Sequence, residues 1–418
     1  MGAATAKVGW CRDCAVKATI KIPQRPPTLP RARVVYHRGP LSHINIKVVV
    51  MTYAAITGWG KCMPPAVLDN AGIATFIDTT DEWIFSRTGI KERRVSHVPM
   101  TLLSHVAAAR ALACAGLPAV DVDLIVLGTV SADEQVPNTA SGVQDLLGAH
   151  NAASMDVNTA CTSFLYGLSA ATAMIRTGVV RNAVVIGVEG IAPYMDWSNR
   201  NVAVLFGDGA AAVVLQASDE PLGVIAEKLG CYADARHTLR VRGMGTIYGN
   251  NELQLGDTRW DFDGPEIFKR AVQGMSHAAE DALTRAALPV SEVGLVVPHQ
   301  ANLRIIEAVA KRCNVSMERV FLTVQRYGNM SSATVPVALV EALEAGRVEP
   351  NSIVLTPAFG AGLTWCAHVI RWGSRVKPLG ATDIDLPPCE KTAVELVQDI
   401  IRHKGKTTKG FEPRLPAR

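Results

Sequence analysis

The stretch SMDVNTACTSFLYGLSAATAMIRTG (residues 154–178) contains a short strand pattern, a turn and a long helical pattern in succession. The helical pattern ends with Arg176 and Gly178, a basic last turn followed by the residue that best tolerates a left-handed helix end. A strand that leads directly into a helix is typical of α/β folds. Cys161 lies where the strand gives way to the helix, and we expect it in the first helical turn.

The same alternation of strands and helices runs along most of the chain. Near-continuous Val/Ile/Leu strands between amphipathic helices indicate sheets that are covered on both faces. The order of elements is repeated after about residue 222, which predicts an α/β fold of two related halves, residues 50–222 and 223–372. Ligands of such sheets bind in clefts at the carboxyl ends of the strands. The expected strands are 122–130, 154–158, 182–190, 293–301 and two within 351–372, and the expected helices are 139–150, 161–178, 264–288, 302–313 and 333–346.

The two ends of the chain depart from this pattern. Residues 1–49 are basic and proline-rich without periodicity, which predicts a disordered leader or a non-native extension. A transit peptide and a true start at Met51 are the alternatives. Residues 373–418 form an appendage of unknown role, in which 390–405 is predicted to be an amphipathic helix. Its apolar side contains Val394, Leu396, Val397 and Ile400 or Ile401.

Composition narrows the class of protein. The 418 residues are 48% hydrophobic and 19% charged, as in a globular protein, and no apolar run reaches the roughly 18–20 residues that cross a bilayer. The net charge is +4, but the first 50 residues contain nine Lys/Arg and one acid, so the rest carries −4. We therefore expect neither nucleic acid nor a membrane as a partner.

The cysteines indicate the compartment. Their number, nine, is odd, and they are scattered through apolar segments, which favours free thiols in a reducing, cytoplasmic setting. Cys11 and Cys14 form a close pair, but no second pair completes a zinc site, so we predict no metal.

Three stretches contain candidate chemistry. Near a helix start, unpaired N–H groups and the helix dipole favour a thiolate, so Cys161 is a candidate nucleophile; a buried packing residue is the alternative. His299, in PHQANLRII (298–306), follows a predicted strand and can donate a hydrogen bond from Nε2 to an oxygen that gains negative charge. Asn329, in YGNMSSATVPVALVEAL (327–343), offers a neutral amide donor, with Ser331 and Ser332 as possible helix caps. A structural histidine and a turn asparagine are the alternatives for these two residues.

With DTTDEWIFSRTGIKERRV (78–95) and PAFGAGLTW (357–365), these stretches make residues 50–372 resemble the 3-oxoacyl-[acyl-carrier-protein] synthase III family. The resemblance implies a thiolase-like fold of five αβαβα layers, a homodimer, and an initiating condensing enzyme of fatty-acid synthesis. The implied reaction is a decarboxylating Claisen condensation of an acyl-CoA with malonyl-acyl carrier protein (malonyl-ACP). It proceeds through an acyl-Cys161 intermediate to 3-oxoacyl-ACP, CoA and CO2. Coenzyme A thioesters and acyl carrier protein are the implied partners, and no cofactor is needed.

The resemblance also implies a role for individual residues. Cys161, His299 and Asn329 match the catalytic triad, and the N–H groups of Cys161 and Ala361 match the oxyanion hole. Three further sets of residues match family positions. The contacts of the CoA adenine are Trp83, Arg87 and Arg200, and the acyl pocket contains Val136, Phe206 and Phe359. The docking patch for the carrier protein consists of Lys269, Arg304, Lys311 and Arg312. Core packing for Trp83 and a solvated helix face for the docking set are the alternatives.

Three departures from the family pattern bear on the site. Thr162 and Ser163 replace a common Ala-Gly pair, and Ala361 stands where glycine is common. Val136 stands where some members carry a Phe that closes the acyl pocket across the dimer, which suggests a starter longer than acetyl.

A related acyltransferase or condensing enzyme of specialised metabolism, with another acceptor, is the alternative function. A non-catalytic binding protein that kept the fold is the third reading.

Overall fold

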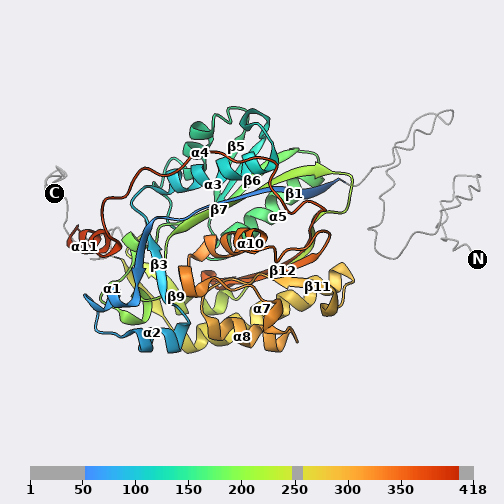
Figure 1. The fold of residues 1–418 in the computed structure, drawn as a ribbon. Helices are drawn as coiled ribbons and strands as arrows, with labels where there is room; N and C mark the ends of the chain where they lie inside the picture. The colour runs from blue at the N-terminus through green and yellow to red at the C-terminus, as the bar shows by residue number, and fades with distance from the viewer. Residues whose placement is uncertain (1–51, 247–257, 404–418) are drawn as a thin grey trace, which may run out of the picture. The chain divides into compact units, whose positions relative to one another are not determined.

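The computed structural model describes residues 52–246 and 258–403 of the chain (Figure 1). The leader predicted for residues 1–49 lies outside the described residues. The strands are β1 Tyr53–Cys62, β2 Ala66–Asp69, β3 Glu92–Val95, β4 Leu124–Gly128, β5 Ala153–Val157, β6 Asn182–Glu189, β7 Gly209–Ser218, β8 Gly223–Cys231, β9 Leu239–Arg242, β10 Arg259–Phe262, β11 Val293–Val296, β12 Ile353–Gly360 and β13 Thr364–Arg371. The α-helices are α1 Asn70–Ala74, α2 Asp81–Thr88, α3 Met100–Ala115, α4 Thr139–Leu147, α5 Ser163–Arg176, α6 Arg200–Ala203, α7 Gly264–Ala286, α8 Leu303–Arg312, α9 Val324–Tyr327, α10 Thr334–Glu344 and α11 Ala393–His403.

The main sheet contains the same strand pattern twice. Among the described residues its order is β11-β12-β13-β8-β1-β7-β6-β4-β5. Starting from the middle, β1-β7-β6-β4 and β8-β13-β12-β11 each make two antiparallel pairings and then a parallel one. The two sets meet where β1 and β8 pair in parallel at Ala54 and Gly223. The part of the chain before the connection between β7 and β8 and the part after it thus form the same strand pattern.

Helices lie on both sides of each set of strands (Figure 1). Helices α3 and α4 cover one outer face, α7 and α8 cover the other, and α5 and α10 lie between the two sets. Each interface is apolar because the strands face helices on both sides; β4 (LIVLG) and β12 (IVLTPAFG), for example, are buried throughout. The predicted α/β fold of five layers with two related halves is confirmed.

The boundaries differ from the sequence predictions at two functional places. The helix expected from residue 161 begins at Ser163, and the strand expected over 293–301 ends at Val296. His299 therefore lies in the loop between β11 and α8, although its backbone N–H still bonds the Pro357 carbonyl at 2.9 Å. The side chains of Cys161 and His299 are thus held by loops at strand ends rather than by regular elements.

The segment after β13 is packed against the N-terminal half (Figure 1). Leu379 N–H bonds the Cys114 carbonyl of α3 at 3.0 Å, and Arg110 of α3 pairs with Asp385 at 3.1 Å. The segment ends in α11, which contacts β2 and β3 and buries Ala393 and Val397. The described part of the predicted appendage therefore belongs to the folded body.

We expect Val397→Ala to lower the free energy of unfolding by about 1.5–3 kcal/mol, because it removes two methyl groups from a fully buried site. Ile401→Ala, four residues along the same helix where the side chain is 38% exposed, should cost less than ~1 kcal/mol. Urea unfolding of the two variants measures both values. Equal losses would mean that α11 is not packed as described.

Candidate functional site

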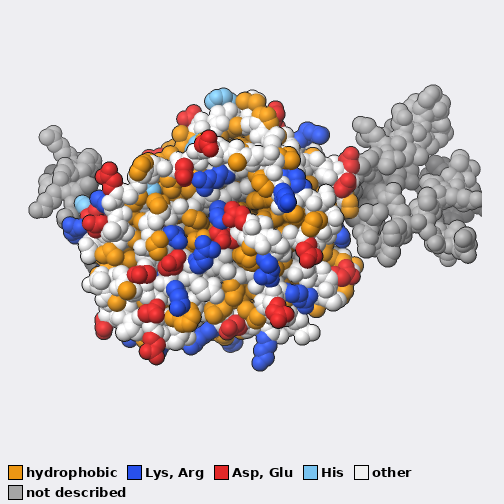
Figure 2. Space-filling view, viewed as in Figure 1, with side chains coloured by type: hydrophobic (Ala, Val, Ile, Leu, Met, Phe, Trp, Pro, Cys, Tyr) orange, Lys and Arg blue, Asp and Glu red, His pale blue; other side chains and the backbone are white. Residues whose placement is uncertain are grey.

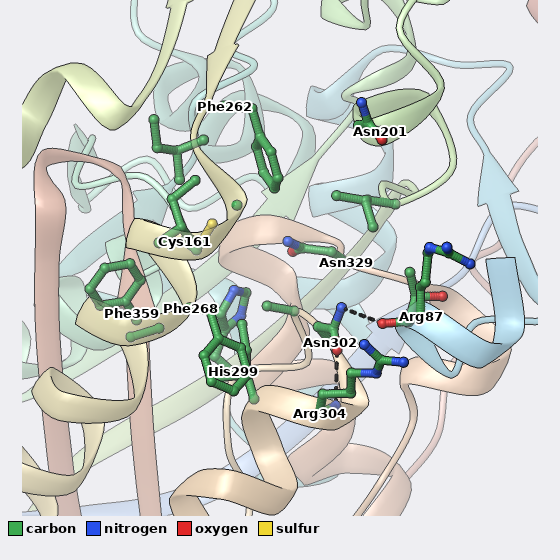
Figure 3. Close-up of a pocket in the computed structure, with 18 of the residues that line it drawn as sticks. Arg87, Cys161, Asn201, Phe262, Phe268, His299, Asn302, Arg304, Asn329 and Phe359 are labelled. Carbon is green, nitrogen blue, oxygen red and sulfur yellow. Dashed lines mark hydrogen bonds between the residues drawn. The ribbon is translucent and has the colours of Figure 1, made fainter. Parts of the chain in front are cut away.

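Three loop segments meet at one cavity of about 670 Å³ (Figure 3). Cys161 precedes α5, His299 follows β11, and Asn329 lies between α9 and α10. All three side chains line the cavity, together with Phe206 and Phe359. A volume of this size is ordinary for a small-molecule site. The fold thus brings together the three residues that the sequence singled out.

Cys161 lies two residues before α5, not within its first turn. The helix begins at Ser163 and its N-cap is Thr162, so Cys161 occupies the approach to the helix. The preceding residue, Ala160, has a left-handed backbone with φ of 54°. The two residues that depart from the family pattern hold this turn: Thr162 Oγ1 donates to the Thr159 carbonyl at 2.7 Å, and Ser163 Oγ donates to the Ala160 carbonyl at 2.6 Å.

Gly360 lets the end of β12 approach the turn that holds Cys161. A Cβ at this position would lie 2.8 Å from the backbone nitrogen of Cys161 and 3.1 Å from the Thr159 carbonyl oxygen. Any larger residue would therefore separate the two halves here. Ala361 follows directly and begins the short helix η8 (Ala361–Leu363), so the two backbone N–H groups expected to form an oxyanion hole come from neighbouring segments.

Burial opposes the thiolate that the nearby helix start favours at Cys161. Burial raises the pKa of the Cys161 thiol from 9.0 to about 12, although a hydrogen bond with the Ser331 hydroxyl acts in the opposite direction. A helix dipole contributes about 0.3–1 kcal/mol near a helix start, which changes a pKa by less than about 1. The dipole cannot offset burial, so the sulfur keeps its proton until a base removes it.

His299 is buried and neutral. Burial lowers the pKa of His299 to about 3, so the ring is uncharged at physiological pH. Its Nδ1 lies 2.6 Å from the Thr334 hydroxyl, which also reaches the Ser331 carbonyl at 2.9 Å. The Thr334 hydroxyl has one proton for these two partners, and the carbonyl can only accept. When Thr334 donates to Nδ1, the ring proton is on Nε2 and Nε2–H can donate into the cavity; when Thr334 donates to the Ser331 carbonyl, Nδ1–H donates to Thr334 and Nε2 is an acceptor.

Asn329 is fixed at both its backbone and its side chain. Its N–H bonds the Leu205 carbonyl at 2.9 Å, and its carbonyl accepts from Gly207 N–H at 3.1 Å. The side-chain Oδ1 accepts from Ser331 N–H at 2.8 Å, which leaves the Nδ2 amide as the free donor. Figure 3 shows this amide directed toward the space that Cys161 and His299 share.

Cationic and aromatic side chains gather at the mouth of the cavity. The guanidinium carbons of Arg87 and Arg200 lie 4.6 Å and 4.8 Å from the centre of the Trp83 ring. Trp83 and Arg87 line the cavity and Arg200 lies beside it, so the predicted CoA-binding set comes together. Cation–π contacts of this kind are worth ~0.5–1 kcal/mol at exposed sites.

The start of α8 holds the end of α2. Asn302 caps α8 and donates from Nδ2 to the Arg87 carbonyl at 3.0 Å, while Arg304 donates to the Ser86 carbonyl at 2.8 Å. Arg304 also lines the cavity (Figure 3). Its guanidinium therefore positions the mouth, in addition to the docking role that the sequence suggested.

The other predicted docking cations lie on exposed surfaces of α7 and α8. Lys311 and Arg312, seven and eight residues after Arg304, share a side of α8 with it, and Lys269 lies on the neighbouring α7. All four are exposed. Figure 2 shows basic and acidic side chains interspersed on the viewed face rather than gathered by sign.

The predicted acyl-pocket residues separate into two groups. Phe206 and Phe359 are buried and line the cavity. Val136 does not line it, because it lies on the loop between β4 and α4 with 82% of its surface exposed. The prediction placed Val136 in a pocket that is closed across a dimer, so its exposure within one chain leaves the prediction untested.

Several functional groups were missed by the sequence reading. Ser331 and Ser332 do not cap α10, whose N-cap is Ala333 without a side-chain bond. Ser332 Oγ instead accepts from Phe164 N–H at 3.0 Å and so caps α5 in the other half. Glu189, a buried acid at the end of β6, was not singled out. An acidic residue that closes an apolar strand run was the available signal.

Two negative findings concern the described residues only. No group of three His, Cys, Asp or Glu in residues 52–246 and 258–403 is placed to hold a metal ion. Over the same ranges, no helix has the length and apolarity that a bilayer crossing demands. The Cys11 and Cys14 pair lies outside the described residues.

Known proteins share both the sequence and the fold. The family model described as 3-oxoacyl-[acyl-carrier-protein (ACP)] synthase III matches residues 155–233, and the model of its C-terminal part matches residues 283–372. Beta-ketoacyl-[acyl-carrier-protein] synthase III 2 of Vibrio cholerae is 49% identical over 351 residues, which cover 84% of this chain and 97% of the relative.

Solved structures give the same result. 3-Oxoacyl-[acyl-carrier-protein] synthase III from Aquifex aeolicus superposes with a TM-score of 0.71 at 38% identity, over 76% of this chain and 100% of the other. The priming beta-ketosynthase from the R1128 polyketide biosynthetic pathway gives 0.74 at 30% identity, over 79% and 99%. The chain therefore belongs to the 3-oxoacyl-[acyl-carrier-protein] synthase III family.

Proposed function

We propose that the enzyme condenses an acyl-CoA with malonyl-ACP, releasing CO2 and CoA and forming 3-oxoacyl-ACP. One observation carries the proposal: a thiol, an imidazole and an amide from three separate loops line one cavity. These groups provide a nucleophile and two neutral hydrogen-bond donors, which are the parts that a thioester condensation needs. Family membership supports the same reaction.

In the first half-reaction, Cys161 attacks the acyl-CoA carbonyl and CoA leaves as a thiolate. The tetrahedral oxygen is held by the N–H groups of Cys161 and Ala361, whose approach depends on the bare backbone of Gly360. One donor of this kind is typically worth about 3–4 kcal/mol of transition-state stabilisation. The methyl group of Ala361 leaves its N–H available.

In the second half-reaction, malonyl-ACP enters and loses CO2. The enolate oxygen accepts hydrogen bonds from Nε2–H of His299 and from Nδ2–H of Asn329, and the carbanion then attacks the acyl group on Cys161. The low pKa of His299 supports a neutral donor at this step, because an uncharged ring stays in place without a counter-ion. Both thioesters are already activated, so we propose that the reaction needs no cofactor.

The mouth of the cavity suits the two carriers. The Trp83 ring, with Arg87 and Arg200 beside it, offers a stacking surface for the CoA adenine and cations for its phosphates. Lys269, Lys311 and Arg312 offer exposed cations on α7 and α8 to an acidic carrier protein. We also propose a cytoplasmic setting, which the seven free thiols among the described residues support.

We further propose that the enzyme is a homodimer. β5 ends the described sheet with a free edge, and such edges are ready to pair with another strand. The exposed Val136 lies on the loop that leads toward α4 and β5, where a partner's cavity could receive it. A small side chain there leaves room for a starter longer than acetyl.

The R1128 relative favours a second candidate function. That enzyme is a priming ketosynthase of polyketide biosynthesis, and this chain is 30% identical to it. Condensation for a specialised pathway, with a different acceptor, would use the same three groups in the cavity. The identity of the acceptor separates the two candidates.

Separate half-reactions test the assigned roles. With mixed acyl-CoAs of increasing chain length, intact mass should show one acyl group on the protein, longer than acetyl, and none on Cys161→Ala. His299→Ala and Asn329→Ala should still become acylated but lose roughly 10²–10³-fold in CO2 release from malonyl-ACP. A Cys161→Ala variant that retains acylation, or triad variants that decarboxylate normally, would contradict the assignment.

Variants of the two proposed binding surfaces should change KM for acyl-CoA and KM for malonyl-ACP separately. Trp83→Ala should raise KM for acyl-CoA roughly tenfold, since stacking on an aromatic ring is worth ~1–3 kcal/mol per base, and leave KM for malonyl-ACP unchanged. Lys311→Glu combined with Arg312→Glu should raise KM for malonyl-ACP and leave KM for acyl-CoA unchanged, and the rise should be largest at low salt. Lys377→Glu, an exposed charge reversal on the segment that follows β13, is the matched control. A rise of both KM values in every variant would argue against separate binding surfaces.

A further inference from the structure

Three threonines meet where the two halves touch, beside the nucleophile. Thr159 and Thr162 belong to the turn that holds Cys161, between β5 and α5, and Thr364 is the first residue of β13. The Oγ1 atoms of Thr162 and Thr364 lie 2.8 Å apart, and they lie 2.7 Å and 2.9 Å from the Thr159 carbonyl oxygen. Thr162 has no exposed surface, so its hydroxyl finds its partners within the protein.

Two hydroxyl oxygens at 2.8 Å need a proton between them, and this makes the bonds continuous across the halves. If Thr162 donates to the Thr159 carbonyl, its oxygen accepts from the Thr364 hydroxyl; the short distance of 2.7 Å favours this arrangement. If Thr162 donates to Thr364 instead, the Thr364 proton goes to the Thr159 carbonyl or to the Ala361 carbonyl, which is 3.2 Å away. In both arrangements the turn is hydrogen-bonded to β13.

Thr364 closes the segment that presents the second proposed oxyanion donor. It pairs with Gly360 across the antiparallel strands β12 and β13, so Ala361 and the rest of η8 lie between these two partners. Gly360 also approaches the turn so closely that a Cβ on it would lie 2.8 Å from the Cys161 nitrogen. The threonine pair therefore fastens together the two segments that present the N–H groups of Cys161 and Ala361.

A different contact holds η8 to its own half. The N–H of Tyr232, which follows β8, bonds the Leu363 carbonyl at 2.8 Å, and Leu363 N–H bonds the Tyr232 carbonyl at 3.3 Å. These bonds place η8 in the C-terminal half but do not involve the turn. The threonine pair adds the link across the halves. An alanine at position 162, as in the common family pattern, would leave only the contact between Thr364 and the Thr159 carbonyl.

We propose that the Thr162 and Thr364 hydroxyls form a clamp that holds the Cys161 turn against the Ala361 segment and so sets the spacing of the two oxyanion-hole N–H groups. This rests on the proposed function, in which Cys161 is acylated through a tetrahedral intermediate. Neither threonine lines the cavity, so both are positioning residues. An oxyanion hole is effective when its donors are in place before charge develops, so a looser turn should slow acyl transfer without weakening substrate binding.

Paired alanine and serine variants isolate the two hydroxyls. Serine and alanine both lack the threonine methyl group, so Thr162→Ala and Thr162→Ser differ only in the hydroxyl. Thr364→Ala and Thr364→Ser make the same comparison in the other half. Thr172→Ala is the matched control, because Thr172 is a buried residue of α5 whose hydroxyl has no hydrogen-bond partner within the described part of the chain.

Three reagents separate acyl transfer from thiol reactivity. An acyl-CoA and p-nitrophenyl acetate both acylate Cys161 through a tetrahedral oxyanion, and the ester needs no CoA site. Iodoacetamide alkylates the same sulfur by displacing iodide, which forms no oxyanion. The rates are read from the mass of the Cys161 peptide. CO2 release from malonyl-ACP is the fourth measurement, because the proposed function assigns it to His299 and Asn329.

Thr162→Ala and Thr364→Ala should each slow acylation by both acyl donors roughly five- to tenfold, the effect of about one net hydrogen bond. The double alanine variant should be no slower than Thr364→Ala, because that change alone removes the link across the halves. In these variants KM for acyl-CoA, the iodoacetamide rate and CO2 release should stay within about twofold of the wild type. Both serine variants and Thr172→Ala should acylate as the wild type does.

Several results would overturn the clamp: serine variants as slow as the alanine variants, additive losses in the double variant, iodoacetamide alkylation slowed as much as acylation, or a loss in Thr172→Ala as large as in Thr162→Ala. If Thr364→Ala does not fold, the two Thr162 variants decide the question. If no acyl-CoA acylates the wild type, the proposed function fails, while p-nitrophenyl acetate still tests the clamp.

Discussion

The loop from Asn329 to Thr334 must fit between two elements of the other half, and the site depends on this fit. Ser332 receives the Phe164 N–H of α5 on its hydroxyl and donates its own N–H to Glu189 at the end of β6. A buried N–H without a partner would cost ~1–3 kcal/mol, so each half completes the hydrogen bonding of the other. Neither half alone can supply a finished helix start behind Cys161.

The same loop sets the orientation of Asn329 and His299. Ser331 N–H fixes the Asn329 amide, and the Ser331 carbonyl accepts from the Thr334 hydroxyl that contacts His299. Each bond contributes only ~0.5–1.5 kcal/mol net, but together they leave each side chain one orientation. The strained backbone of Ser331 is tolerated because these bonds determine its conformation from several sides.

Local patterns were sufficient to predict most strands and helices, the strand-end position of His299 and the place of Asn329 before a helix, whereas Cys161 lies before the helix in which it was expected. They could not predict that Ser332 caps α5, since residues 164 and 332 are related only by the packing of the halves. The raised pKa of the Cys161 thiol was hidden for a similar reason: the helix start was visible in the sequence, but the burial that opposes a thiolate was not. Val136 was placed in the acyl pocket by resemblance alone, across a dimer interface that a single chain does not contain.

Charged side chains lie at the mouth of this cavity, and the side chains inside it that take part in the chemistry are neutral. The permanently charged Arg87, Arg200 and Arg304 are exposed at the mouth, where keeping a guanidinium hydrated costs little. Inside, His299 is neutral and Cys161 is protonated, so no lasting charge has to be buried beside the reacting carbon. Negative charge then develops only during the reaction, opposite neutral donors that are already in place, and such donors need no reorganisation when it appears.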